Sequence, residues 1–256
     1  MIALLAALSL AAAPPCALPP LRGGPLPFAP GELLAYDIEL LGVVRAGTLK
    51  IGVEPPISQG TLLPLRARVS NTSILAQARP MKAYALSWVD VETLRPQRYR
   101  DESEEDGVRK STDTRFDRPG PLTMAWALGE QKGTTEYAPR ADVMDLVSMV
   151  FYLRAARLRP GEDICFDLVA NRRFWRLRGS VASGSERVES GAGTLDTIRL
   201  DAVLTRTDGS GRKRPIHIWF SKGPRRLPVA AVSEIDLGPV RARLSSASQA
   251  PAQHAD

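Results

Sequence analysis

The feature of this sequence that most constrains its fold is a single helical segment in a chain that otherwise alternates like β-strands. Between about residues 142 and 158, apolar side chains recur at helical spacing, so that one stripe can face a core. The stripe consists of Val143, Leu146, Val147, Val150 and Leu153. Asp142 is the expected N-cap, and Pro160-Gly161 is the expected stop signal. One amphipathic helix cannot build a layer of its own, so we expect it to cover a sheet.

Strand patterns fill the chain on both sides of this helix. Residues 33–53 contain two runs of alternating apolar residues, and Pro215 to Ser221, PIHIWFS, has an apolar residue at every second position. Asp106-Gly107 supplies the positive φ of a tight hairpin turn. About ten strands in meander order predict a mainly β protein, built as one large, strongly curved antiparallel sheet or an incomplete barrel. We expect the helix to cover the open side, in a single domain over residues 31–245.

The composition and the missing motifs argue against most enzymatic and nucleic-acid-binding classes. The 256 residues carry a formal net charge of +6, but the arginines are spread along the chain rather than clustered with aromatic residues. The sequence has only two histidines, His217 and His254, and lacks the common nucleophile, zinc-protease, phosphate-loop and dinucleotide motifs. We therefore predict no catalytic residue, no metal site, no cofactor and no nucleic-acid partner.

The first twenty residues have the pattern of a secretory signal. Ile2 to Ala13 is apolar but too short to span a bilayer, and small residues up to Ala11 offer a cleavage site. No Lys or Arg precedes this run, which leaves a start further upstream or a buried N-terminal segment as alternatives. We expect residues 1–20 to direct export to the periplasm or cell envelope. Residues 21–30 then form a Pro/Gly-rich linker, and residues 246–256 a disordered tail.

The chain has two cysteines, Cys16 and Cys165. In an oxidising compartment they are candidates for a disulfide bond, because exported proteins keep such bonds. Two other fates stay open for Cys16. It could anchor a lipid after the signal, although Pro15 rather than a small residue precedes it, or it could be removed.

Several segments carry a family resemblance through their order along the chain rather than through one diagnostic motif. They are FAPGELLAYDIELLGVVRAGTLKI (Phe28 to Ile51), SWVDVETLRPQRY (Ser87 to Tyr99), Phe116-Asp117, DLVSMVFYLR (Asp145 to Arg154), LRPGE (Leu158 to Glu162), HIWFSKGPRRLPVAAV (His217 to Val232) and Gly238. In this order the chain resembles the DUF3108 family of bacterial exported proteins of unknown function. The resemblance extends from about Phe28 to Leu244, which is nearly the whole mature chain.

The resemblance implies an envelope-associated, mostly antiparallel β protein and offers no catalytic residues to carry over. The family often has an acidic residue after the tryptophan-containing strand, whereas this chain has Lys222-Gly223, which argues against an acidic site there. A curved sheet closed by a helix also resembles periplasmic lipid and lipoprotein carriers. That analogy is at the level of the fold alone.

Three functions compete on these observations. The first is non-enzymatic binding of a lipid or other apolar ligand in the concave face, with these lining candidates: Tyr36, Trp88, Val147, Phe151 and Trp219. The second is a structural or interaction role, in which the protein packs on an envelope protein partner without a ligand. An interior filled by side chains would favour this second role. The third, least favoured, is a hydrolase that uses His217 with Ser221 or an aspartate.

Overall fold

The computed structural model describes residues 16–42, 44–72, 81–140, 142–207, 209–235 and 238–249, and its elements are almost all strands. The first half of the chain contains β1 (Leu33–Leu40), β2 (Val44–Val53), a short 3-10 helix η1 (Ser58–Gly60), β3 (Leu62–Asn71), β4 (Met81–Asp90), β5 (Pro96–Glu105), β6 (Val108–Phe116), β7 (Leu122–Leu128) and β8 (Gln131–Tyr137). The second half contains β9 (Val143–Asp145), α2 (Leu146–Ala155), β10 (Asp163–Ala170), β11 (Arg173–Val181), β12 (Glu186–Ser190), β13 (Gly193–Arg206), β14 (Lys213–Ser221), β15 (Pro228–Ile235) and β16 (Gly238–Ser248).

The strands form one continuous sheet in which the two ends of the chain meet in the middle. Its order is β8-β7-β6-β5-β4-β3-β2-β1-β16-β15-β14-β13-β11-β10-β9, with β12 paired to β13 off this path. Neighbours pair antiparallel, except for the short parallel pair of β9 and β10. The sheet does not close, because β8 and β9 lie at its opposite ends. The predicted fold class, one large curved sheet with a single helix, is confirmed.

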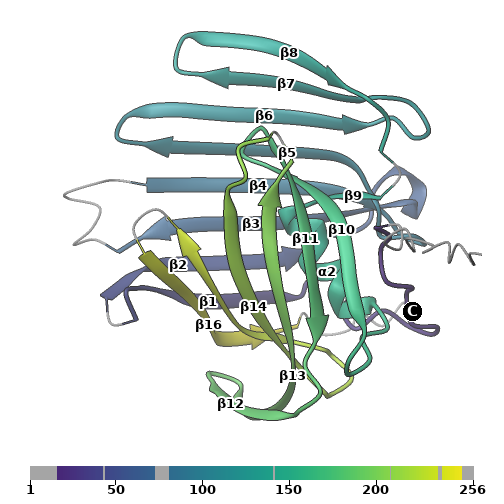
Figure 1. The fold of residues 1–256 in the computed structure, drawn as a ribbon, viewed down its shortest axis with the longest axis vertical. Helices are drawn as coiled ribbons and strands as arrows, with labels where there is room; N and C mark the ends of the chain where they lie inside the picture. Colours follow the sequence, from purple (N-terminus) through teal and green to yellow (C-terminus); the bar gives the residue numbers. More distant parts are fainter. Residues whose placement is uncertain are drawn as a thin grey trace, which may run out of the picture.

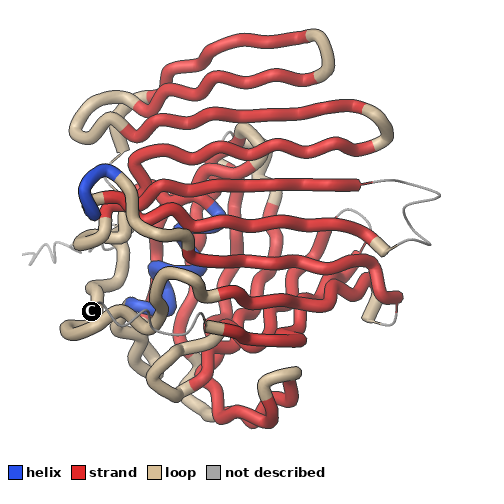
Figure 2. The backbone as a smooth tube through the Cα atoms, turned by 180° about the vertical axis from the view of Figure 1, so that it is seen from behind, coloured by secondary structure: helices blue, strands red, loops and turns tan. Residues whose placement is uncertain are grey.

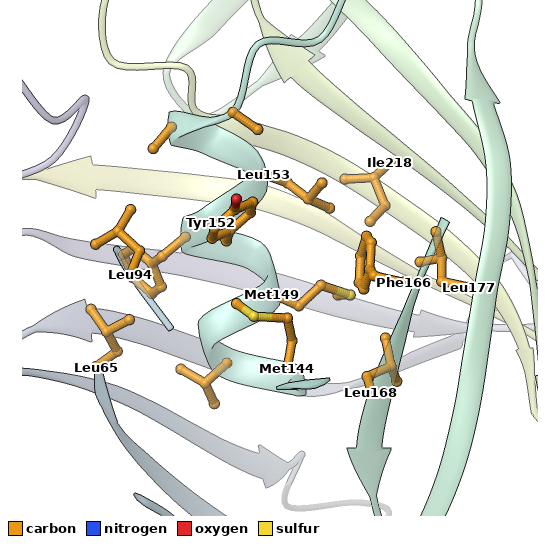
Figure 3. Close-up of a cluster of buried hydrophobic side chains, with 14 of the residues drawn as sticks. Leu65, Leu94, Met144, Met149, Tyr152, Leu153, Phe166, Leu168, Leu177 and Ile218 are labelled. Carbon is orange, nitrogen blue, oxygen red and sulfur yellow. The ribbon is translucent and has the colours of Figure 1, made fainter. Parts of the chain in front are cut away.

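The curvature of the sheet creates an interior, and α2 lies in it. Strands β1 to β8 form one wall, and β10 to β14 cross in front of them (Figure 1). Seen from behind, β1 to β8 lie side by side with the helix beyond them (Figure 2). The helix α2 lies between the two walls: Met149 and Leu153 point toward Phe166 and Ile218 of β10 and β14, and Leu65 of β3 lies on the other side of the helix (Figure 3). No helix within the described ranges is long and apolar enough to cross a membrane.

The helix is shorter and more deeply buried than the sequence predicts. It begins after Asp145 rather than Asp142, because residues Val143–Asp145 pair with β10 as strand β9. It ends at Ala155, well before Pro160-Gly161, because Ala156 has an extended backbone and forms an antiparallel β-bridge with Leu21. Nearly all of its side chains are buried, so the predicted amphipathic stripe is wrong. Leu146, placed in that stripe, is 39% exposed.

Other predicted boundaries also shift. The segment 21–30 is not a free linker, since Pro27 and Phe28 are buried and Arg22 N donates to Ala155 O at 2.9 Å. The tail begins later than residue 246, because β16 continues to Ser248 by pairing with the start of β1. Strand β8 was not predicted, because its sequence QKGTTEY lacks apolar alternation. The predicted signal falls largely on residues 1–15, outside the described part of the chain.

Candidate ligand-binding site on the concave face

The strand register separates an inner, concave face from an outer face. Side chains alternate between the two faces along each strand, and paired residues share a face. The row Leu34, Ile51, Ala67 and Ala85 crosses β1 to β4 on the inner face, as the complete burial of Leu34 shows. Charged residues such as Arg66 and Arg100 lie on the outer face.

One end of the concave face is filled by α2, and we call it the helix end. It lies where β1 begins and β14 ends. Phe151 and Leu153 of the helix are completely buried there, and Phe151 meets the ring of Phe28 edge-on, with the centroids 5.0 Å apart. Inner-face residues such as Leu65 and Phe220 are also fully buried. The helix end is therefore an ordinary packed core without room for a ligand.

A buried ion pair fixes α2 at this end. Arg154 is 0% exposed, and its Nη1 and Nη2 donate to Glu32 Oε1 and Oε2 at 2.5 and 3.1 Å. Nη2 also donates to the carbonyl oxygens of Pro27 and Arg225 at 3.1 and 3.0 Å. The guanidinium lies over the Phe28 ring at 4.9 Å. A buried charge with a bidentate partner and further acceptors is tolerated, whereas either charge alone would be costly.

The N-terminus of α2 is fixed by a second buried polar group. Asp145 accepts hydrogen bonds from Val147 N and Ser148 N, both at 2.9 Å, and from Ser87 Oγ of β4 at 2.6 Å. Ser148 Oγ accepts from Asp145 N at 3.1 Å, which completes a reciprocal cap. Burial raises the pKa of Asp145, and the hydrogen bonds from Ser87 and Ser148 oppose that rise. The cap ties the helix to the wall made by β3 to β5.

The other end of the concave face, which we call the far end, remains partly accessible. It lies where β1 ends and β14 begins. Inner-face apolar residues there are only half-buried: Ile38, Leu49, Val69, Leu204, Ile216, Ala231 and Ala242. On α2, exposed Leu146 and half-buried Val150 share a helix face. An apolar surface on the inside of a curved sheet, contiguous with the core, is the arrangement of a site for an apolar ligand.

Aromatic and cationic side chains border this surface at the far end. The guanidinium carbons of Arg206 and Arg214 each lie 6.0 Å from the ring centroid of Trp175. These residues belong to β11, β13 and β14, and the register puts Arg206 and Arg214 on the inner face. The turn between β10 and β11 adds Arg172, 5.1 Å from the ring of Trp126. These groups could orient the polar end of a ligand.

A carboxylate also faces the interior near Arg172. Asp101 of β5 accepts a hydrogen bond from Thr112 Oγ1 at 2.6 Å. Burial raises the pKa of Asp101, and the hydrogen bonds from Thr112 and Tyr99 and the charge of Arg172 counteract it. Sequence reasoning missed Arg172 and Arg206 as border residues, since only the strand register shows which side chains share the inner face. The sequence signal that could have indicated these border residues is the arginines at the β10–β11 turn and on both sides of the β13–β14 turn.

The five predicted lining residues divide between the two faces. Tyr36, Val147 and Phe151 face the interior, but all are buried in the packed helix end, and Tyr36 Oη donates to Pro228 O at 2.9 Å. Trp88 and Trp219 lie on the outer face and do not line the concavity. In the sequence, both tryptophans lie in strands with alternating apolar residues. That alternation does not tell which face of the strand turns inward, and only the strand register shows it.

The two outer tryptophans belong to surface charge clusters. Arg98 lies 5.2 Å from the Trp88 ring. Trp219 Nε1 donates to Glu186 Oε2 at 2.7 Å, and Arg199 pairs with Glu186. Such aromatic–guanidinium contacts on a solvated sheet face are common and modest in energy.

Of the residues proposed for hydrolysis, His217 meets an aspartate but not Ser221. His217 Nδ1 lies 2.5 Å from Asp201 Oδ1 on the outer face of β13 and β14. Ser221 is buried four residues further along β14, about 13 Å away at the rise of a strand, and its Oγ accepts from Leu227 N at 2.8 Å. Burial raises the pKa of Asp201, but hydrogen bonds from His217 and Arg199 outweigh it and lower that pKa. The His–Asp pair therefore lacks this nucleophile.

The cysteines that the sequence offered as a pair are bonded in the structure. Cys16 and Cys165 form a disulfide with their Cα atoms 4.8 Å apart. Cys165 lies on the outer side of β10, since its neighbours Ile164 and Phe166 point into the core. The bond fastens the N-terminal segment to the sheet beside the helix end.

A hollow of about 780 Å³ lies elsewhere, on the outer face of β2 to β7. Most of its lining belongs to two outward rows of the register, with the cations Lys50, Arg68, Lys82 and Arg109 and the carboxylates Glu102 and Glu104. It is open and strongly charged, so it suits water better than an apolar molecule. Within the described residues, no group of three or more His, Cys, Asp or Glu side chains is placed to hold a metal ion.

The chain is a mainly β protein with one strongly curved, open sheet, whose interior is filled by a helix at one end and is apolar at the other. Its fold is similar to the crystal structure of a beta-barrel-like protein of domain DUF1849 from Brucella abortus. The two chains are 11% identical, the match covers 85% of this chain and 97% of the other, and the TM-score is 0.57. This likeness shows the fold alone.

A second solved structure, a Bacteroides fragilis protein with a YmcC-like fold, is 11% identical with a TM-score of 0.37, and covers 91% of this chain and 100% of its own. At that score the likeness carries no argument. Comparison with curated proteins gave no match. Residues 35–245 match DUF3108, a family described as proteins of unknown function. Because the match spans most of the chain, this protein belongs to the DUF3108 family, and the predicted resemblance is confirmed.

Proposed function

We propose that this protein is a non-enzymatic, exported protein of the cell envelope that binds a lipid or other apolar ligand at the far end of its concave face. One observation carries the proposal: inner-face side chains such as Leu49, Ala231 and Ala242 are apolar and only half-buried, although they continue the packed core. Leaving apolar surface accessible in a concavity is unfavourable unless something covers it. The disulfide supports export, since such bonds persist in oxidising compartments.

The ligand would lie on the apolar inner strands and direct its polar end toward the border residues. Ala231 and Ala242 pair across β15 and β16, next to buried Ile218, so they form the floor nearest the helix. Trp175 with Arg206 and Arg214 lies toward the strand ends. The proposed site does not include Tyr36, Val147 and Phe151, because these side chains are buried in the core at the helix end.

The test is binding of the apolar fluorophore N-phenyl-1-naphthylamine, together with native mass spectrometry of protein purified from an envelope. We expect fluorescence enhancement that Ala231→Phe weakens at least about tenfold, because the added ring occupies the floor, a loss of about 1.4 kcal/mol. Ala125→Phe, at an exposed site on the outer face of β7, is the matched control. Absence of binding in the wild-type chain and of a co-purifying lipid mass would reject the proposal.

A second candidate is an interaction protein that pairs with a partner through its sheet edge. Among the described strands, β8 has a neighbour on one side only, and Lys132 and Thr134 on it are exposed. An unpaired edge offers backbone donors and acceptors to another strand. A photo-crosslinker at Thr134 should then give one product of defined mass in the native envelope, whereas one at Arg178, exposed on the outer face of β11, should not.

A further inference from the structure

Two arginines border the proposed apolar site on the inner face of the sheet itself. Arg206 ends β13 and follows Leu204 by two residues, and Arg214 near the start of β14 precedes Ile216 by two residues. Residues two apart on a strand point to the same side and lie about 6–7 Å apart. Each arginine is therefore the next inner-face residue beyond a half-buried apolar residue of the site.

The two guanidinium groups lie close together because they share one aromatic neighbour. Their Cζ atoms are each 6.0 Å from the ring centroid of Trp175, which pairs with Arg206 from the adjacent strand β11. Leu204 pairs with Arg214, so Arg206 and Arg214 are diagonal neighbours across β13 and β14, which lie side by side in Figure 1. Diagonal neighbours are about 7–8 Å apart, within reach of long side chains. The register and the ring distances thus agree in placing both cations at one point of the border.

The inner face around this pair is positive and otherwise apolar. Both arginines are half-buried, and Arg214 Nη1 donates to the carbonyl oxygen of Glu234 at 3.0 Å, which orients its guanidinium. Among the described inner-face residues of β11 and β13 to β16 at the far end, none is a carboxylate. The third border cation, Arg172, lies beside Trp126 of β7 and is not part of this pair. Neighbouring like charges repel each other, and an anion placed between them reduces that repulsion.

We propose that the ligand of the far end is an amphiphile with an anionic head, and that Arg206 and Arg214 bind this head. The inference rests on the proposed apolar site and specifies the chemical class of its ligand. Guanidinium groups donate paired hydrogen bonds to the oxygens of a carboxylate or a phosphate. The apolar chain of the ligand then lies over Leu204 and Ile216 and extends toward Ala231, whereas a neutral apolar molecule gains nothing from the two charges.

The test is displacement of N-phenyl-1-naphthylamine from the oxidised full chain by two pairs of ligands that differ only in the head. Oleate is compared with oleyl alcohol, and a lysophosphatidylglycerol with the lysophosphatidylcholine of the same acyl chain. The wild type should bind the anionic member of at least one pair about tenfold more tightly, because its head accepts charge-assisted hydrogen bonds. A preference confined to oleate assigns a carboxylate head, and a preference for lysophosphatidylglycerol assigns a phosphate head.

Matched variants locate the head on the sheet. Arg206→Gln combined with Arg214→Gln should abolish the preference and leave the affinity for oleyl alcohol unchanged. Arg206→Lys combined with Arg214→Lys keeps both charges without the planar fork and should retain part of the preference. Arg178→Gln, exposed on the outer face of β11, removes one positive charge and should keep the wild-type preference. Arg214→Gln alone, which should reduce the preference, carries the test if the double glutamine variant does not fold.

The outcomes separate a failure of the head site from a failure of the apolar site. If the wild type binds neither the fluorophore nor any of these ligands, the apolar site is rejected and the anionic head with it. If the fluorophore binds but the anionic and neutral ligands displace it equally, the apolar site stands and the anionic head is rejected. A preference that persists in the double glutamine variant, or that Arg178→Gln also abolishes, overturns the role of Arg206 and Arg214.

Discussion

The two ends of the concave face are made by the same strands, yet they differ in how their apolar surface is covered. At the helix end, Phe151 and Leu65 are fully buried, and the Arg154–Glu32 pair fixes the helix over them. At the far end, Leu49 and Ala231 belong to the same inner face but stay half-buried. A ten-residue helix is about 15 Å long, which is shorter than the strands it covers. The difference shows that α2 covers the apolar inner face of the sheet at the helix end and leaves it partly accessible to solvent at the far end.

The largest expected effect comes from breaking the anchor of the helix end. Arg154→Met should reduce the free energy of unfolding by about 3–5 kcal/mol, because it leaves the buried Glu32 with Arg225 as its remaining ion-pair partner. The double variant Arg154→Met with Glu32→Leu should recover most of this loss, although Arg225 then loses its carboxylate. Urea unfolding of both variants measures the difference. Equal stability of the single and double variants would show that the pair does not anchor the helix.

Truncating one leucine at each end tests the comparison directly. Leu65→Ala should cost about 2–5 kcal/mol, because it opens a cavity in a packed region. Leu49→Ala should cost about 1 kcal/mol or less, since its side chain is already partly accessible. Denaturant unfolding gives both values. Similar losses at the two sites would mean that the far end is packed as tightly as the helix end.

The smallest effect concerns the pH dependence contributed by the cap of α2. Burial raises the pKa of Asp145 in the folded protein, so the folded state holds that proton more tightly than the unfolded chain does. The contribution of Asp145 to stability is therefore largest at acid pH and falls as the pH rises through its folded pKa. Asp145→Asn stays neutral and keeps an acceptor oxygen for the helix, so it should gain stability relative to the wild type between about pH 4 and neutrality.

Asp113 is the matched control for this effect. A hydrogen bond from Arg98 lowers the pKa of Asp113 in the folded protein, so its contribution has the opposite sign. Relative to Asp113→Asn, the wild type should gain stability as the pH rises through the unfolded value of about 3.9. Urea unfolding at several pH values measures both differences. An Asp145→Asn difference that does not change with pH would contradict the prediction.

Much of the fold was predictable because its elements have strong local patterns. Strands such as β4 and β14 alternate clearly, and one helical segment among them indicated a curved sheet with an internal helix. The helix start was misplaced because Asp142 and Asp145 are both good caps. Only tertiary pairing of Val143–Asp145 with β10 decides between them. Strand β8 was missed because an edge strand with polar faces has no pattern to detect.

The candidate site was less predictable, because it depends on which residues face each other. Trp88 and Trp219 alternate with apolar neighbours, and sequence cannot tell which face of the strand turns inward. Tyr36 and Phe151 were predicted to line the ligand site and are buried in the core instead, because the sequence does not say that α2 fills one end of the concave face.

The disulfide gives the covalent chain a shape of its own. Because Cys16 is joined to Cys165, residues 16–165 form a closed ring that contains β1 to β9, α2 and the start of β10, whereas β11 to β16 follow as an open branch. Strand β16 of the branch completes the sheet by pairing with β1 of the ring. When the oxidised protein unfolds, the disulfide still joins the two ends of the ring, whereas the branch becomes a chain with one free end. The partner strands at the centre of the sheet therefore sample very different volumes before they meet.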